Sequence, residues 1–456
     1  MKGKAKGESE RRKSVAVGKR YLVETFGCQM NVHDSERLSG LLEGVGYQPT
    51  EDLERADLLI INTCSVRERA AEKLFARLDR FRNKSREARP TIAVTGCVAQ
   101  QEGDKILERA PVVDVIIGTQ ALEKLPLAIE TSEESGSFYV DINPYDNVSF
   151  PLGVVKRNDS VKAYITIIEG CNDFCSFCVV PYTRGRERMR PVAEILEEAK
   201  RVGADGHREV HLLGQIVNHY QAPDIPDCDF SELLERLQRV PRIDRIRFAS
   251  PHPRHVSLRM IEAVARLPKV CKHLHLPVQS GSTRVLSLMR RRHTRERYLA
   301  LVGDVRRQIP RINLSTDMIV GFPGETINDF EETLNLVRAV RYHNIYSFKY
   351  SERPQTLAEL RMPNTVSEEE KSRRLTELQS LQKGIQLSLH QQMIGRVFEV
   401  LTESKSRRRD GEYCGRTSGN VIVNFPSAEN CVGSFVGIEI MRAGPNSVWG
   451  TQVGLR

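Results

Sequence analysis

Short apolar runs alternate with longer amphipathic stretches through the first quarter of the chain. Runs of this length and β-branched composition are typical of buried strands, and the stretches between them repeat apolar residues at helical spacing. The pattern predicts four strands: Tyr21–Thr25, Leu58–Ile61, Thr91–Thr95 and Val113–Ile117. It also predicts a helix that ends near Gly44 and a charged helix over about Arg67–Asn83. Strands that alternate with helices predict a parallel sheet covered on both faces.

The same alternation resumes after residues 132–159, a segment rich in Ser, Gly, Pro, Asn and acidic residues that predicts a connection between domains. Six further strands are predicted: Val161–Ile168, Glu209–Leu213, Arg245–Ala249, His273–Leu276, Asn313–Val320 and Ile345–Lys349. Helices fall between them, including Ala193–Val202, Ser231–Gln238 and Arg295–Gln308. Six strand–helix units predict a partial barrel of the TIM type, since a complete barrel has eight.

The last part of the chain begins with a long helix and then changes character. Ser367 and Glu370 predict a capping box at its start. Four apolar residues then recur at helical spacing and indicate a core-facing stripe: Leu375, Leu378, Leu381 and Ile385. From about Gln391, short strands alternate with Gly-rich turns: Val397–Leu401, Val421–Asn424 and Phe435–Ile440. This pattern predicts a small antiparallel β-barrel.

These patterns divide the chain into four parts. They are a disordered tail over residues 1–19, a flavodoxin-like or Rossmann-like α/β domain over 20–135, a partial barrel with its last helix over 157–388, and a small β-barrel over 390–454. The tail is charged and has no hydrophobic segment of the kind that a secretory signal needs. No apolar run reaches the length of a membrane span. We expect a cytoplasmic protein without a membrane partner, and a monomer.

Three of the ten cysteines lie in one loop after the first strand of the partial barrel, at the spacing C-x3-C-x2-C: Cys171, Cys175 and Cys178. Three closely spaced thiolates hold three irons of a cubane 4Fe–4S cluster and leave the fourth iron open. An open iron chelates S-adenosylmethionine, which an electron then cleaves to a 5′-deoxyadenosyl radical. The loop resembles the radical-SAM superfamily signature, in which Phe177 suits packing near the adenine. Zinc is the alternative, but zinc sites usually pair two C-x2-C halves.

Three more cysteines follow three successive strands of the first domain. Cys28 stands in Phe26-Gly27-Cys28, Cys64 in Asn62-Thr63-Cys64, and Cys97 in Thr95-Gly96-Cys97. The carboxyl ends of parallel strands share one edge of an open sheet, where ligands bind. The three thiols are therefore expected to converge on a second cluster, and the alternative is three thiols packed under loops.

Polar motifs follow the other strands of the partial barrel, where active-site loops are expected. Four residues in these motifs are candidates to hold S-adenosylmethionine or the substrate: Gln215, Gln279, Ser280 and Asp317. Gln279 and Ser280 could instead cap the next helix, and Asp317 could satisfy buried backbone groups. We expect three histidines in this region to be structural: His252, His273 and His275.

The formal net charge of +9 favours a polyanionic partner such as nucleic acid. Four arginines at alternate positions follow the cysteine loop and are candidates to line an RNA path: Arg184, Arg186, Arg188 and Arg190. Three arginines of the small barrel suit a phosphate backbone: Arg407, Arg408 and Arg416. A solvated charged loop explains the basic residues of the small barrel equally well.

Three motifs together resemble the MiaB-type tRNA methylthiotransferases, a radical-SAM family. They are Thr25-Phe26-Gly27-Cys28-Gln29-Met30-Asn31, Asn62-Thr63-Cys64-Ser65-Val66-Arg67, and the run from Gly170-Cys171 to Gly185. The resemblance extends from about residue 20 to 454. It implies an N-terminal methylthiotransferase domain, a radical-SAM core and a C-terminal TRAM domain.

The resemblance also implies an activity: isopentenyladenosine next to the anticodon of tRNA gains a methylthio group at C2. Cys171, Cys175 and Cys178 would hold the radical-SAM 4Fe–4S cluster. A second set, Cys28, Cys64 and Cys97, would hold an auxiliary 4Fe–4S cluster that carries the sulfur. Two molecules of S-adenosylmethionine would be used per turnover, one as methyl donor and one as radical source. A reducing protein such as flavodoxin or ferredoxin would supply the electrons.

Other substrates and one other class of protein stay open. Relatives of the RimO type, which modify an aspartate of a ribosomal protein, usually carry Pro-Lys where this chain has Gln29-Met30. Relatives that modify threonylcarbamoyladenosine in tRNA usually carry Lys-Val there. The chain departs from the family at Gln355, where Gly is frequent, and before residue 20, where no counterpart is found. A zinc-stabilised RNA-binding protein without catalysis is the alternative from another class.

Overall fold

The computed structural model describes residues 18–65, 68–143, 155–406 and 409–454. The chain divides into two compact units. The first contains residues up to 158 together with Glu169–Asn172 and Val179–Glu187, and the second contains the remainder. Most of the predicted disordered tail and the middle of the predicted connection, residues 144–154, lie outside the described residues.

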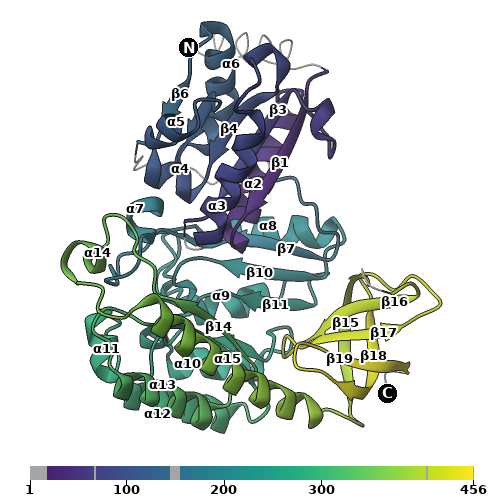
Figure 1. Ribbon diagram of the computed structural model, residues 1–456. Helices are drawn as coiled ribbons and strands as arrows, with labels where there is room; N and C mark the ends of the chain where they lie inside the picture. The colour runs from purple at the N-terminus through teal and green to yellow at the C-terminus, as the bar shows by residue number, and fades with distance from the viewer. Residues whose placement is uncertain (1–17, 66–67, 144–154, 407–408, 455–456) are drawn as a thin grey trace. The chain divides into compact units, whose positions relative to one another are not determined.

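A six-stranded sheet with the order β2-β1-β3-β4-β5-β6 forms the centre of the first unit (Figure 1). Its strands are β1 (Arg20–Phe26), β2 (Gln48–Pro49), β3 (Leu58–Thr63), β4 (Thr91–Thr95), β5 (Val115–Ile117) and β6 (Tyr139–Asp141). Every neighbouring pair is parallel, so the predicted parallel sheet is confirmed. The hydrophobic pattern misses β2, which has only two exposed residues. It also misses β6, which lies in the predicted connection and extends the sheet beyond residue 135.

Helices cover both faces of this sheet, because successive residues of a buried strand point to opposite sides. The face that presents Ile60 is covered by α2 (Gln29–Gly44) and α6 (Leu125–Ser135). The face that presents Ile61 is covered by α3 (Glu68–Leu78), α4 (Cys97–Glu102) and α5 (Lys105–Arg109). The helix predicted over Arg67–Asn83 is shorter than expected, because α3 ends at Leu78 and a single 3-10 turn, η2 (Asp79–Phe81), follows it.

Six parallel strands make the partial barrel of the second unit, as the sequence predicts. They form two sheets: β7 (Lys162–Thr166), β10 (Glu209–Leu213) and β11 (Arg245–Phe248), then β12 (His273–His275), β13 (Asn313–Val320) and β14 (Asn344–Lys349). A parallel bridge between Ile246 of β11 and Val270 places the segment just before β12 beside the first sheet. Two short strands, β8 (Ile168–Glu169) and β9 (Arg188–Met189), flank the cysteine loop in the sequence.

Helices of the partial barrel enclose one large apolar core. They are α8 (Val192–Ala204), α9 (Phe230–Leu237), α10 (Leu258–Arg266), α12 (Arg295–Gln308), α13 (Ile327–Val340) and α15 (Glu368–Gln391). Two short helices, α11 (Thr283–Leu288) and α14 (Leu357–Arg361), pack in a smaller apolar cluster outside this core. The apolar stripe predicted for α15 is confirmed, since Leu378 and Ile385 are buried in this core. Only half of its predicted capping box forms. Ser367 Oγ accepts the amide of Glu370, but the Glu370 carboxylate pairs with Arg373 and Arg374 instead of reaching back.

A closed five-stranded barrel follows α15 and confirms the predicted small β-barrel. It is not wholly antiparallel as predicted, because β17 and β19 pair in parallel while the other neighbouring pairs are antiparallel. Its strands are β15 (Val397–Lys405), β16 (Glu412–Thr417), β17 (Ile422–Pro426), β18 (Phe435–Ala443) and β19 (Val448–Val453). Two arginines of β11 attach it to the partial barrel. Arg247 donates to the carbonyls of Thr417 at 2.8 Å and Ser418 at 3.1 Å, and Arg245 donates to that of Arg416 at 2.7 Å.

Candidate active site

The structure brings three cysteines of the first unit to one edge of its sheet. Strand β1 pairs with β3 as far as Phe26 and Thr63, and β3 pairs with β4 as far as Asn62 and Thr95. Cys28, Cys64 and Cys97 stand one or two residues beyond these pairs, and the amide of Cys64 still donates to the carbonyl of Phe26 at 2.8 Å. In-register strand ends therefore place the three thiols at the carboxyl edge of the sheet.

Two glycines let these strand ends approach one another. A Cβ on Gly27 would lie 2.2 Å from the Cβ of Cys64. A Cβ on Gly96 would lie 2.3 Å from Asn62 Oδ1 and 2.7 Å from the Thr63 carbonyl, and Gly96 has a φ of +92°. Only glycine fits where the backbone is both left-handed and in close contact. The Gly-Cys pairs are therefore a packing requirement of this edge.

Two asparagine amides fix the position of Cys28. The Cys28 thiol donates to Asn31 Oδ1 at 3.2 Å. Asn31 Nδ2 donates to Asn62 Oδ1 at 2.9 Å, and Asn62 Nδ2 donates to the Asn31 carbonyl at 2.8 Å. Both asparagines are fully buried. They stand in the motifs that carry the family resemblance, but no charge or spacing in the sequence marks them as positioning residues.

The electrostatics of this edge favour a thiolate at Cys28. A hydrogen bond with the Cys64 thiol and the charge of Arg184 lower the pKa of Cys28 to about 6. Burial raises the pKa of Cys97, although the charge of the nearby Arg184 guanidinium opposes the shift. Arg184 belongs to α7 (Val180–Arg184), a short helix of the first unit, and its partner is Asp34 at 2.6 Å. A cation beside thiols lowers the free energy of the thiolate form, which is the form that binds metal.

The cysteine loop is divided between the two units, and each part has its own supports. In the first unit, the amide of Cys171 donates to the Gly185 carbonyl at 3.1 Å. In the second unit, Cys175 receives a hydrogen bond from Arg291 Nη1 at 3.5 Å. Ser176 is fully buried, and its hydroxyl donates to the Leu288 carbonyl at 2.8 Å. A positive charge again faces a thiol, at Cys175.

The donor set at both places fits iron–sulfur clusters better than a single ion. In the described parts of the chain, no three His, Cys, Asp or Glu side chains are close enough to hold one metal ion. A cubane cluster is less demanding, because each thiolate binds a different iron. None of the ten cysteines, all of which are described, is in a disulfide. The arginines beside these thiols would offset the negative charge of such a cluster.

Three of the predicted cofactor contacts lie where a ligand could use them. Phe177 packs against the apolar cluster of Met289, Phe322 and Tyr350. Gln279 is buried and has a φ of +80°, a conformation that non-glycine residues adopt mainly at functional sites. Gln215 Oε1 is buried and has no hydrogen-bond partner among the described residues. An unsatisfied buried acceptor is a candidate for a ligand contact.

Two other predicted contacts differ in their surroundings. Ser280 is fully buried, and its hydroxyl accepts the amide of Ser282 at 3.2 Å, which stabilises the start of α11. Asp317 is 30% exposed and lies 3.4 Å from His275 Nε2, which leaves it accessible. The histidines are held by protein groups, as expected. His273 and His275 share the Ser315 hydroxyl, and His252 accepts the amide of Arg254.

The predicted RNA-binding arginines need correction. Arg184 is 4% exposed and pairs with Asp34, so it is part of the three-thiol edge. Arg190 is buried between Glu194 and Glu198. Arg186 is exposed, and Arg188 is half-buried. On the small barrel, Arg416 pairs with Glu403 at 3.2 Å, and Arg407 and Arg408 lie outside the described residues. Alternation in the sequence does not separate these roles, because burial depends on tertiary packing.

Three segments of this chain match known protein families, and these matches define the class of protein. Residues 165–337 match the profile of the radical SAM superfamily, residues 391–453 match that of the TRAM domain, and residues 20–118 match "Uncharacterized protein family UPF0004". The radical S-adenosylmethionine methyltransferase TsrM from Kitasatospora setae has a similar fold over 75% of each chain, with a TM-score of 0.54 and 15% identity. The chain is a radical-SAM protein with a C-terminal TRAM domain.

Close relatives then give the family. A protein from Geotalea uraniireducens is 44% identical over 433 residues, which cover 94% of this chain and 97% of that protein. A protein from Carboxydothermus hydrogenoformans is 44% identical over 425 residues, which cover 92% and 96%. Both are named tRNA-2-methylthio-N(6)-dimethylallyladenosine synthase. This chain belongs to that family, and the resemblance to MiaB-type methylthiotransferases is confirmed.

None of the helices in the described part of the chain combines the length and hydropathy that a membrane-spanning helix requires.

Proposed function

We propose that this protein transfers a methylthio group to C2 of N6-isopentenyladenosine beside the anticodon of tRNA. The observation that carries the proposal is the convergence of Cys28, Cys64 and Cys97 on one sheet edge, in a chain that also has the radical-SAM loop. A radical-SAM enzyme that only cleaves S-adenosylmethionine needs a single cluster. A second set of three thiols therefore supports sulfur transfer.

In this proposal each set of thiols holds one 4Fe–4S cluster. Cys171, Cys175 and Cys178 hold the first, and Cys28, Cys64 and Cys97 hold the second. When bound, the first cluster supplies the electron that cleaves S-adenosylmethionine, and the second supplies the sulfur atom, chemistry that no side chain provides. S-adenosylmethionine acts both as methyl donor and as radical source. The electron donor is a small reducing protein such as flavodoxin or ferredoxin.

The chain's own residues bind and orient these groups. Arg184 and Arg291 place a positive charge beside a thiol of each set. Asn31 and Asn62 hold Cys28 in place. In the second unit, the apolar cluster around Phe177 offers a surface for the adenine ring of S-adenosylmethionine. The buried Gln215 Oε1 offers a hydrogen-bond acceptor to the amino group of the adenine or to that of the methionine part.

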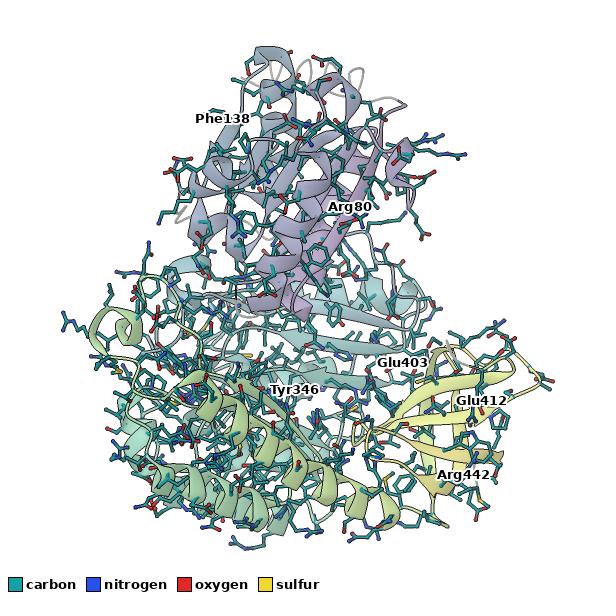
Figure 2. The ribbon with its side chains drawn as sticks, in the orientation of Figure 1. Arg80, Phe138, Tyr346, Glu403, Glu412 and Arg442 are labelled. Carbon is teal, nitrogen blue, oxygen red and sulfur yellow. The ribbon has the colours of Figure 1, made fainter. Side chains whose placement is uncertain are left out.

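The small barrel supplies an RNA-binding groove of about 700 Å³. Its lining contains three cations, Lys405, Arg409 and Arg442, and one carboxylate, Glu412. The guanidinium of Arg442 lies 4.1 Å from the ring of Trp449, whose indole N–H donates to Glu412 Oε1 at 3.1 Å (Figure 2 labels Arg442 and Glu412). Cations beside a half-buried aromatic ring that lines the groove suit phosphates and unpaired bases. In the proposal this groove holds the tRNA outside the modified nucleotide.

The experiment that tests the proposal compares tRNA nucleosides and ribosomal proteins by mass spectrometry from a deletion strain. We expect the deletion to remove the 2-methylthio group from isopentenyladenosine, and the wild-type gene to restore it. A Cys64→Ala gene should not restore it. Loss of the group from a ribosomal-protein aspartate or from threonylcarbamoyladenosine instead would contradict the proposal.

A further inference from the structure

Arg184 stands at the junction between the three thiols and a buried ionic network. Its guanidinium donates to Asp34 Oδ2 at 2.6 Å, and its helix, α7, packs against α4, which begins at Cys97. The Arg184 side chain is 4% exposed and that of Asp34 is 1% exposed. A buried arginine without several partners is unfavourable, so these contacts define its position closely.

The charges around Arg184 come from three segments of the first unit. Helix α2 contributes Asp34 and Arg37, which are 3.9 Å apart. Residue Glu169 lies 3.3 Å from Arg37. The two arginines balance the two carboxylates, so any thiolate at Cys28 or Cys97 adds negative charge that Arg184 is best placed to offset. Arg184 is thus the cation whose charge acts on both Cys28 and Cys97, and Asp34 holds it in place.

We propose that Arg184 is a positioning residue whose charge, oriented by Asp34, sets the reduction potential of the cluster held by Cys28, Cys64 and Cys97. This inference rests on the proposed function, because it requires that cluster. A positive charge favours the more negative, reduced form of a cluster, and hydrogen bonds to its sulfur ligands act in the same direction. Removing the charge of Arg184 makes the cluster harder to reduce. Removing the charge of Asp34 makes it easier.

The opposite signs distinguish this role from a merely structural one. If the pair only joined α7 to α2, loss of either partner would disturb the same contact in the same way. The variants are Arg184→Gln, which keeps a shorter polar side chain without the charge, and Asp34→Asn, which keeps the shape of the side chain without the charge. The double variant Asp34→Asn/Arg184→Gln removes both charges and avoids an unpaired buried ion, which is the costly outcome of a single change. Arg186→Gln changes an exposed arginine of the same segment and is the control.

The test is a redox titration, followed by electron paramagnetic resonance, of the full chain in which Cys171, Cys175 and Cys178 are alanine. This parent protein should bind about four irons, and its signal then comes from one cluster. We expect a more negative midpoint potential for Arg184→Gln and a more positive one for Asp34→Asn. The double variant and Arg186→Gln should stay near the parent value.

Shifts of the same sign in both single variants, or unchanged potentials with iron retained, would overturn the inference. If Arg184→Gln does not fold, the midpoint potentials of Asp34→Asn and of the double variant test the inference instead. A more positive potential in Asp34→Asn that returns to the parent value in the double variant supports the role of Arg184, and any other pattern refutes it. A parent protein that binds no iron contradicts the cluster assignment of the proposed function itself, and the inference falls with it.

Discussion

Replacing Gly96 by alanine tests whether close strand-end packing forms the three-thiol edge. Gly96 has a φ of +92°, and a Cβ there would lie 2.3 Å from Asn62 Oδ1 and 2.7 Å from the Thr63 carbonyl. A left-handed conformation costs a non-glycine residue about 1–2 kcal/mol. The backbone of β3 cannot move aside as a flexible side chain would, so overpacking adds about 1–3 kcal/mol. Gly96→Ala should therefore destabilise this edge by about 2–5 kcal/mol.

Gly206 is the matched control for the conformational part of this cost. It has a φ of +97°, and a Cβ there would meet nothing within 4 Å. Gly206→Ala should lower local stability by only about 1–2 kcal/mol, and only around residue 206. Hydrogen exchange measures both effects, because it gives the opening free energy of each segment separately. In Gly96→Ala the amides of β3 and β4 should lose protection, and in Gly206→Ala they should not.

The same variant should lose one cluster selectively. Cys97 follows Gly96 directly, so a displaced strand end moves this thiol away from Cys64. Reconstituted Gly96→Ala should hold about four irons per chain, and the wild type about eight. Cleavage of S-adenosylmethionine should continue, since the cysteine loop is unchanged. Wild-type protection of β4 together with full iron content in Gly96→Ala would show that close packing at Gly96 does not form the three-thiol edge.

Three further predictions concern the second unit. Arg247→Met leaves the buried Glu209 carboxylate without its partner at 3.0 Å and removes the hydrogen bonds to Thr417 and Ser418. The attachment of the small barrel should lose about 3–5 kcal/mol of stability, so proteolysis of β16 should become faster. Unchanged proteolysis would contradict this. Trp449→Leu should weaken tRNA binding about tenfold in a filter-binding assay, whereas unchanged affinity would exclude base stacking in the groove. Burial lowers the pKa of His343 to about 4 from 6.5, so the folded state stays neutral while the unfolded state takes a proton. The contribution of His343 to stability is complete above pH 6.5 and is lost as the pH falls to about 4. The thermal midpoint of His343→Asn should therefore change less with pH than that of the wild type. Equal pH dependence of the two midpoints would contradict the burial of a neutral His343.

The elements that the sequence predicts best are long or strongly apolar. All six barrel strands and four of the six strands in the first sheet are found within a few residues of their predicted positions. Strands β2 and β6 are missed because they have two and three residues, too few for a period-2 pattern to emerge. The capping box fails at Glu370 because two arginines, Arg373 and Arg374, compete for its carboxylate.

The site is predictable only in part. The carboxyl ends of parallel strands lie at one edge of the sheet, so the convergence of Cys28, Cys64 and Cys97 could be expected from the sequence. Arg184 could not be assigned, because its neighbour in space, Asp34, is 150 positions away in the chain. The departure at Gln355 also becomes clear only in the structure. Its φ of +69° explains why glycine suits this position.

The iron and sulfide content of the anaerobically reconstituted full chain, measured beside a Cys28→Ala/Cys64→Ala/Cys97→Ala variant, shows directly whether the protein holds two clusters. Two clusters with separate roles predict about eight irons for the wild type and about four for the variant, with cleavage of S-adenosylmethionine retained and sulfur insertion into tRNA lost. Fewer than about six irons in the wild type, or loss of cleavage in a folded variant, would contradict two clusters with separate roles.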